Sequence, residues 1–230
     1  MKERPIIFSG EMVRAILDGR KTMTRRAMKP QPNHHHWEYM QSYRLEHKLL
    51  GSKNLLWAKF WHTIKENPES DGKQWIKFPY GQIGDRLWVR ETHYRYGHWV
   101  KNGKTKTGRQ KYKFCADKDG FTSLIFDCPD EWIQKNKNLE GWFKRPSIYM
   151  PRWASRILLE ITNVRVERLN QIVWGDCEKE GIDLSGLAWS DMPPVAKNKF
   201  RKLWDSINGK KYPWASNPWV WVIEFKRLNP

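Results

Sequence analysis

The chain lacks the features of several large classes of protein. Its 230 residues include only three cysteines, Cys115, Cys128 and Cys177, and no C-x-x-C pair. Neither a disulfide framework nor a zinc ribbon is therefore expected. No apolar run approaches the length of a membrane span, and the run at residues 6–8 is too short for a signal peptide. We expect a cytoplasmic protein that does not enter the membrane.

Motifs of common catalytic classes are missing as well. G-x-S-x-G, H-E-x-x-H and G-x-G-x-x-G do not occur, so redox cofactors and metalloprotease chemistry have no support. The segment 19–22 resembles a phosphate loop, but Arg20 separates its glycine from its lysine. The run His34–His36 is interpreted as a solvent-facing loop, because adjacent histidines cannot all aim at one ion and no cysteine lies nearby. We expect no metal and no cofactor.

Acidic residues are scarce relative to basic ones. The chain has 42 lysines and arginines against 25 acids, a net charge of +17, and a pI of about 9.8. Such an excess favours polyanions, because each neutralised phosphate releases counterions. The charge therefore favours contact with nucleic acid or nucleotides over a protein that is merely basic. Tryptophan is abundant, with fifteen residues. Tryptophan can stack on bases, but most of these side chains are expected to be structural.

Hydrophobic spacing predicts ordered ends and an irregular middle. Two stretches, 31–79 and 97–147, are interpreted as insertions. In the first we expect a helix near 55–65. In the second we expect a hairpin with a solvated tip at 101–113, and pairing of 111–115 with 122–126. Elsewhere the patterns predict strands at 5–8, 87–90, 157–166 and 219–226, and helices at 12–17 (N-capped by Ser9), at 170–179 and around an apolar stripe of Phe200, Leu203, Trp204 and Ile207.

Strands outnumber helices in this pattern, and parallel βαβ units are absent. We therefore expect a single domain, residues 1–230, of the α+β class. The architecture that fits best is a small mixed β-barrel with short helices at its ends and the two insertions.

The segment Gly19–Arg26 concentrates four cations and two hydroxyls directly after the first predicted helix. A threonine such as Thr24 needs a base to act as a nucleophile. Lys21 could be that base if burial or neighbouring cations lower its pKa. An acid would also be needed, and the candidates are Glu91, Glu160 and Glu180. The alternative is that these cations only bind phosphate, and spacing alone favours this alternative.

Five pieces of the chain, in order, resemble the ASCH domain, a family of PUA-like β-barrels. They are Ala15–Thr24, Gly84–Leu87, Leu159–Thr162, Glu180–Ile182 and Val222–Lys226. The phrase Met150–Arg156 and the long insertions resemble the larger ASCH-like proteins of bacteriophages and prophages, which implies the cytosol of a bacterial host.

The resemblance implies RNA binding or nucleotide-related roles. Some small bacterial members resemble amidohydrolases that remove the acetyl group from N4-acetylcytidine without a metal. Their base, nucleophile and acid correspond to Lys21, Thr24 and Glu180. The resemblance also implies phosphate or oxyanion contacts and base stacking. The candidate residues are Arg20, Arg25, Arg26, Arg152 and Arg156 for the anion, and Trp88 and Trp153 for the base.

We therefore expect a nucleic-acid- or nucleotide-binding protein with a basic cleft that recognises a modified cytosine base. The alternative is an amidohydrolase acting on N4-acetylcytidine or a related acylated base. The expected partner is nucleic acid, with RNA favoured over DNA, or a nucleoside. The two insertions and the high positive charge depart from the small enzymes and leave the substrate open.

Overall fold

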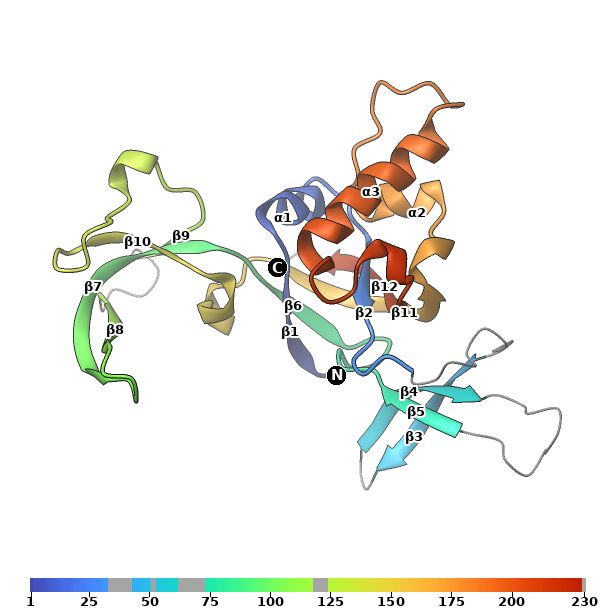
Figure 1. Ribbon diagram of the computed structural model, residues 1–230, viewed down its shortest axis with the longest axis horizontal. Coiled ribbons are helices and arrows are strands. Elements are labelled where there is room, and N and C mark those ends of the chain that lie inside the picture. The colour runs from blue at the N-terminus through green and yellow to red at the C-terminus, as the bar shows by residue number, and fades with distance from the viewer. Residues whose placement is uncertain (33–42, 51–52, 62–72, 118–123, 229–230) are drawn as a thin grey trace. The chain divides into compact units, whose positions relative to one another are not determined.

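Figure 1 shows the structure, a computed structural model that describes residues 1–32, 43–50, 53–61, 73–117 and 124–228. Strands dominate these residues and helices are few, so the α+β class is confirmed. The described strands form three sheets of five, four and three strands, and none of these sheets closes into a barrel. The closed barrel expected from the sequence is therefore not confirmed.

The largest sheet joins both ends of the chain. It contains, in pairing order, β1 (Glu3–Ile7), β6 (Arg86–Arg90), β11 (Leu158–Arg168), β12 (Trp219–Leu228) and β2 (Met23–Ala27). Strand β12 pairs antiparallel with β11 on one side and with β2 on the other. Residues 219–223 and 225 of β12 are buried, as expected for a strand enclosed on both faces. The four strands predicted from alternation are thus present.

Helices α2 (Trp174–Lys179) and α3 (Met192–Asn208) pack on β2 and β12 around one apolar cluster. Its buried members are Met23, Leu169, Ile172, Cys177, Leu184, Ala196, Phe200, Trp204, Trp214, Val220 and Val222. On α3 the buried residues recur every four positions, at Ala196, Phe200 and Trp204. Ile207 lies off that row and is 54% exposed, so its predicted place in the core is wrong. The predicted helices near 12–17 and 170–179 correspond to α1 (Gly10–Leu17) and α2.

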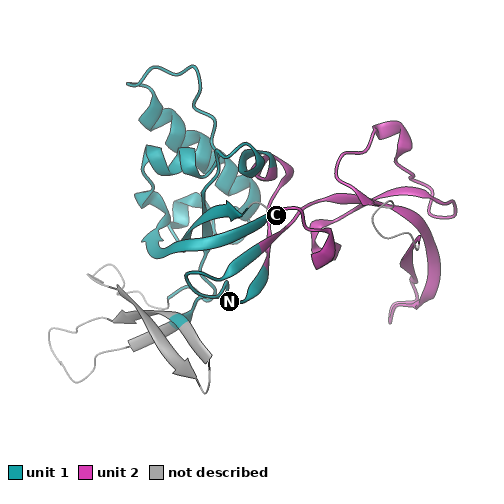
Figure 2. Cartoon of the chain, turned by 180° about the vertical axis from the view of Figure 1, so that it is seen from behind, with its two compact units in different colours: residues 1–4, 14–87, 158–229 teal, residues 5–13, 88–157, 230 magenta. Residues whose placement is uncertain are grey.

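The chain divides into two compact units, coloured in Figure 2. Unit 1 contains residues 1–4, 14–87 and 158–229, and unit 2 contains residues 5–13, 88–157 and 230. Unit 2 carries the four-stranded sheet, built from β10 (Gly141–Arg145), β7 (His93–Lys104), β8 (Gln110–Ala116) and β9 (Leu124–Ile125).

The hairpin expected at 101–113 is present as β7 and β8. The predicted pairing of 111–115 with 122–126 is wrong, because both segments pair with β7 instead. Strand β7 is 12 residues long. Trp99 of β7 pairs with Phe114 of β8, and Tyr94 of β7 pairs with Ile125 of β9. One long strand therefore pairs with both β8 and β9.

The three-stranded sheet consists of β3 (Tyr43–Leu50), β4 (Lys53–Trp61) and β5 (Lys73–Lys77). The helix expected near 55–65 is wrong over its described part, because β4 pairs antiparallel with both neighbours there. Its leucines and aromatic residues suit a strand as well as a helix. The run His34–His36 lies outside the described residues.

The remaining regular elements are single 3-10 turns: η3 (Asp130–Trp132), η4 (Ser147–Tyr149), η5 (Arg152–Ala154), η6 (Leu169–Gln171) and η7 (Trp214–Ser216). Within the described part of the chain, we find no helix with both the length and the apolar character needed to cross a membrane.

Candidate functional site

Local structure at the end of α1 fixes the direction in which Lys21 enters the fold. Gly19 adopts φ +77°, and its N–H donates to the carbonyl of Ile16 at 3.1 Å. The N–H of Lys21 then donates to the carbonyl of Ala15 at 2.9 Å. A left-handed residue of this kind is favourable for glycine and ends the helix as its position in the sequence predicts.

Lys21 and Glu180 form a buried ion pair within unit 1. The Nζ atom of Lys21 donates to Oε2 of Glu180 at 2.7 Å and to the main-chain carbonyl of Glu180 at 2.7 Å. The two side chains are 0% and 3% exposed. Burial lowers the pKa of Lys21, and the opposing attraction of Glu180 does not fully offset it. A lowered pKa makes the neutral amine of Lys21 accessible at a lower pH than for a lysine in water, and its contact with Glu180 gives the proton a partner.

Gly181 allows the end of α2 to approach Lys21 this closely. It adopts φ +92°, and a Cβ atom there would lie 2.9 Å from Cβ of Ala15 and 3.3 Å from Cβ of Lys21. A side chain at this position would push the two segments apart. A glycine directly after Glu180 is therefore needed for the contact between Lys21 and Glu180.

Arg25 is enclosed by carboxylates. Its side chain is 0% exposed, and its guanidinium lies 2.9 Å from Glu167, 2.5 Å from Asp176 and 3.5 Å from Glu180. Arg165 extends this network through ion pairs with Glu167, Asp176 and Glu224. The charge of Arg25 is thus compensated inside unit 1, so its surroundings do not favour the phosphate-binding role expected from the sequence.

Thr24 is 2% exposed in β2, where it pairs with Ile223 of β12. Arg25 Nη1 contacts the sulfur of Met23 at 3.4 Å, and Met23 belongs to the cluster under α2. Alternation along the strand therefore places Thr24 on the opposite face of β2 from Met23 and Arg25. The structure thus brings Lys21 and Glu180 together and places Thr24 on the other face of β2.

The two other candidate acids have different partners. Glu91 accepts two hydrogen bonds from Arg156, at 3.0 and 2.9 Å, so both charges are engaged in one bidentate pair. Glu160 pairs with Lys226 at 3.0 Å. Glu180 is therefore the candidate acid that contacts Lys21.

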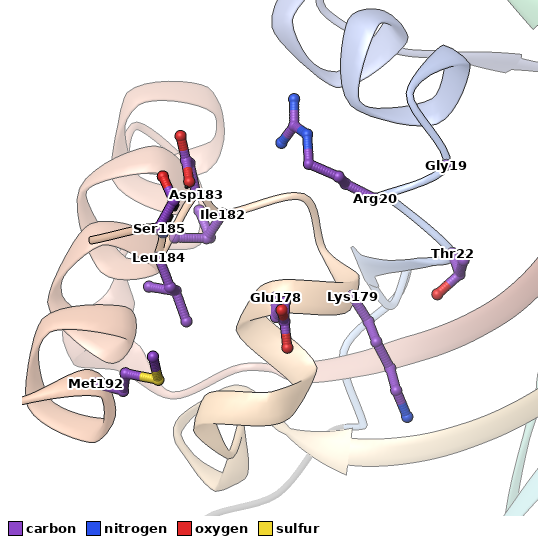
Figure 3. Close-up of a pocket in the computed structure, with 10 residues that line it drawn as sticks. All are labelled: Gly19, Arg20, Thr22, Glu178, Lys179, Ile182, Asp183, Leu184, Ser185 and Met192. Atoms are coloured by element: carbon purple, nitrogen blue, oxygen red, sulfur yellow. Dashed lines mark hydrogen bonds between the residues drawn. The ribbon is translucent and has the colours of Figure 1, made fainter. Parts of the chain in front are cut away.

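A pocket of about 520 Å³ lies beside these segments (Figure 3). Its lining residues are Gly19, Arg20, Thr22, Glu178, Lys179, Ile182, Asp183, Leu184, Ser185 and Met192. The N–H of Thr22 donates to the carbonyl of Lys179 at 2.9 Å, and Arg20 donates to the carbonyl of Gly181 at 3.3 Å. The pocket is thus lined by sequence neighbours of Lys21 and Glu180 rather than by Lys21, Thr24 or Glu180 themselves.

The predicted stacking residues differ in accessibility. Trp88 is 7% exposed, and the guanidinium of Arg90 lies over its ring at 4.6 Å. Trp153 is 44% exposed, with Arg95 at 5.5 Å. Of the predicted anion-binding arginines not yet described, Arg152 lies 6.0 Å from the Trp88 ring, and Arg26 is half-buried in β2 opposite Trp221. Only Trp153 of the two tryptophans offers an accessible ring.

Two functional candidates, Arg95 and Arg145, were not found from the sequence. Arg145 lies over the rings of Trp99, Phe114 and Tyr149 at 4.8, 4.6 and 5.0 Å. A sequence signal was available, because residues 93–116 contain seven lysines and arginines and no acid. The grouping of Arg95 with Arg145 depends on the pairing of β7 with β10, which the sequence does not show.

In the described residues, no three His, Cys, Asp or Glu side chains are grouped so as to hold a metal ion.

Comparison with protein-family models, with curated proteins and with solved structures found no match. The relation to the ASCH domain therefore stays a prediction from the sequence.

Proposed function

We propose that this chain is a nucleic-acid-binding protein related to the ASCH family, with unit 1 as a PUA-like β-domain. The observation that carries the proposal is the charge of the β7–β8 hairpin. Its outer part exposes six cations and no acid: Lys101, Lys104, Lys106, Arg109, Lys111 and Lys113. None of the six forms a salt bridge with another described residue. Uncompensated cations on an exposed hairpin attract phosphate.

The pocket of unit 1 supports a place for a nucleotide in this proposal. Its volume lies within the usual range for small-molecule sites. Arg20 can meet a phosphate in exchange for its half-exposed ion pair with Asp18, and the apolar side chains of Ile182, Leu184 and Met192 can contact a base. A modified cytosine fits such a mixed lining, because its ring is flat and its edge is polar.

Salt dependence tests the phosphate-binding proposal. The affinity for a single-stranded 20-mer, measured by fluorescence anisotropy, should fall steeply as salt rises. The variant Lys104→Gln/Lys106→Gln/Arg109→Gln should bind more weakly, and its log–log salt slope should be smaller by about 2, since each lost contact to a single strand removes about 0.7.

The matched control is Lys202→Gln/Lys210→Gln/Lys211→Gln, which removes the same charge from exposed positions of unit 1. The control should keep the wild-type slope. Affinity that does not change with salt would contradict phosphate binding, and equal losses in both variants would contradict a specific role for the hairpin.

A second candidate function is the metal-independent amidohydrolase, and the Lys21–Glu180 contact favours it. In this mechanism Lys21 takes the proton of Thr24, whose oxygen attacks the acetyl carbonyl. Lys21 passes that proton through its contact with Glu180, which protonates the departing exocyclic amine. Water then releases acetate from the threonine ester and restores the hydroxyl proton of Thr24. Since Thr24 lies on the other face of β2, Lys21 must leave Glu180 to reach it.

Acetate release from N4-acetylcytidine, as nucleoside and within an oligonucleotide, tests this second function. The variant Thr24→Val should lose at least about a thousandfold in rate, whereas Thr162→Val, at an exposed position of β11, should retain activity. The rate should rise with pH as Lys21 loses its proton, with a midpoint below 10.5 because burial lowers its pKa. Wild-type protein that releases no acetate at any pH would exclude this function.

A further inference from the structure

Arg95 and Arg145 are brought together by the register of β7 and β10 in unit 2. Arg145 pairs with His93, and Arg95 pairs with Phe143, two residues further along. Residues two apart on a strand share a face, so both arginines project from the same side of the sheet. Burial lowers the pKa of both guanidinium groups, and the charge of Arg95 also contributes to the lowering at Arg145. Two partly buried cations thus lie side by side and repel each other.

No carboxylate among the described residues pairs with either arginine. The Nε atom of Arg95 is buried and has no hydrogen-bond partner in the described structure. Both guanidinium groups instead lie on aromatic rings, which attract a cation but do not neutralise it. A partly buried cation without a counter-ion is unfavourable. An anion bound between Arg95 and Arg145 would relieve both charges.

Accessible aromatic rings adjoin the two cations. Tyr149 is 60% exposed and lies 5.0 Å from the Arg145 guanidinium. Trp153 is 44% exposed and lies 5.5 Å from the Arg95 guanidinium. A single nucleic-acid strand presents both phosphates and open base faces, so it can use cations and rings together. A duplex hides its base faces in the stack and can use only the cations.

We propose that the face of unit 2 around Arg95 and Arg145 binds a single strand of nucleic acid. The two guanidinium groups bind a backbone phosphate, and the rings of Tyr149 and Trp153 stack on neighbouring bases. The proposal rests on nucleic-acid binding as the function of the protein, and adds to it a defined surface and a preference for single strands.

The structural alternative is that Arg145 only covers the rings of Trp99, Phe114 and Phe143, which pack edge-to-face at 5.2–6.1 Å. Such a covering role predicts loss of stability on substitution, without a specific loss of binding. Arg95 and Tyr149 are not part of that aromatic group, so variants at these two positions separate binding from packing.

The experiment compares affinities for a single-stranded 20-mer and for the matching duplex, using the full chain. Wild-type protein should prefer the single strand. Arg95→Gln/Arg145→Gln should weaken single-strand binding at least about tenfold more than Lys135→Gln/Lys144→Gln, which removes the same charge from exposed positions of unit 2. Tyr149→Leu should weaken single-strand binding by about tenfold, in keeping with the loss of one stacked base, and should leave duplex binding unchanged.

Should Arg145→Gln unfold unit 2, as thermal unfolding would reveal, Arg95→Gln and Tyr149→Leu carry the same test. Equal losses in the arginine variant and the lysine control would overturn this surface but leave nucleic-acid binding in place. A Tyr149→Leu variant that binds single strands as well as the wild type would also overturn it. Wild-type protein that binds neither strand nor duplex would overturn both the surface and the proposed function.

Discussion

Replacing Lys21 by methionine should lower the free energy of unfolding by about 3–5 kcal/mol, the usual result of removing one partner of a buried ion pair. The ammonium group fills a site with 0% exposure and makes two hydrogen bonds to Glu180. Methionine preserves much of the volume, but it leaves the Glu180 carboxylate with only the 3.5 Å contact to Arg25. The change therefore leaves a buried negative charge poorly compensated.

Urea unfolding followed by circular dichroism measures this loss. The double variant Lys21→Met/Glu180→Leu should recover much of the stability, because it removes the charge that the single variant leaves unpaired. Arg20→Met is the matched control, since its ion pair with Asp18 is about half exposed. That substitution should cost less than about 1 kcal/mol. A loss of similar size for Arg20 and Lys21 would contradict the buried pair.

The pH dependence of stability gives a second readout of the same prediction. Burial puts the folded pKa of Lys21 below its ordinary value of 10.5. Between those two pKa values the unfolded chain binds the lysine proton and the folded chain does not. The free energy of unfolding contributed by Lys21 therefore rises with pH across that window. The difference between wild type and Lys21→Met should widen there, and an unchanged difference would contradict the lowered pKa.

Replacing Trp204 by alanine should destabilise unit 1 by about 3–5 kcal/mol, as is usual when a large buried aromatic side chain is removed. Trp204 is 3% exposed within the apolar cluster between the two helices α2 and α3 and the strands β2 and β12. Its indole N–H donates to the carbonyl of Tyr212 at 2.7 Å. The substitution leaves a cavity, and it also removes the hydrogen-bond donor to the carbonyl of Tyr212. The same urea experiment measures the loss.

Ile207→Ala is the natural control, because Ile207 lies on the same helix but is 54% exposed. That change should stay within about 0.5 kcal/mol. The two positions share one apolar stripe in the sequence, so the comparison also tests which of them the fold buries. A large loss at Ile207 would show that its side chain is covered in solution.

The sequence predicted the regular elements at both ends of the chain, because their periodicity agrees with their burial. It failed where a pattern was compatible with two structures. The leucines and aromatic residues of β4 are compatible with either a helix or a strand. Antiparallel pairing with β3 and β5 makes this segment a strand. The sequence pattern predicts that β8 and β9 pair with each other, since it does not show that β7 is long enough to pair with both.

The candidate site was predicted only in part. Lys21 and Glu180, which the resemblance to the ASCH domain suggested, do come together, although they are separated by 159 positions in the sequence. Spacing within 19–26 did not reveal that Arg25 would be enclosed by carboxylates, because those carboxylates come from β11 and α2. Arg95 and Arg145 likewise meet only through strand register. Long-range pairing, rather than local pattern, decides these roles.

Cys177 provides a way to measure how often the interior of unit 1 opens. Its thiol is 0% exposed on α2, one turn before Glu180, and burial raises its pKa to about 12. A thiol that is both covered and protonated does not react with an alkylating reagent until the helix opens. Its rate of modification under native conditions therefore reports how often α2 separates from the sheet. Under the proposed amidohydrolase function, this rate would also measure the opening that gives a substrate access to Lys21 and Glu180.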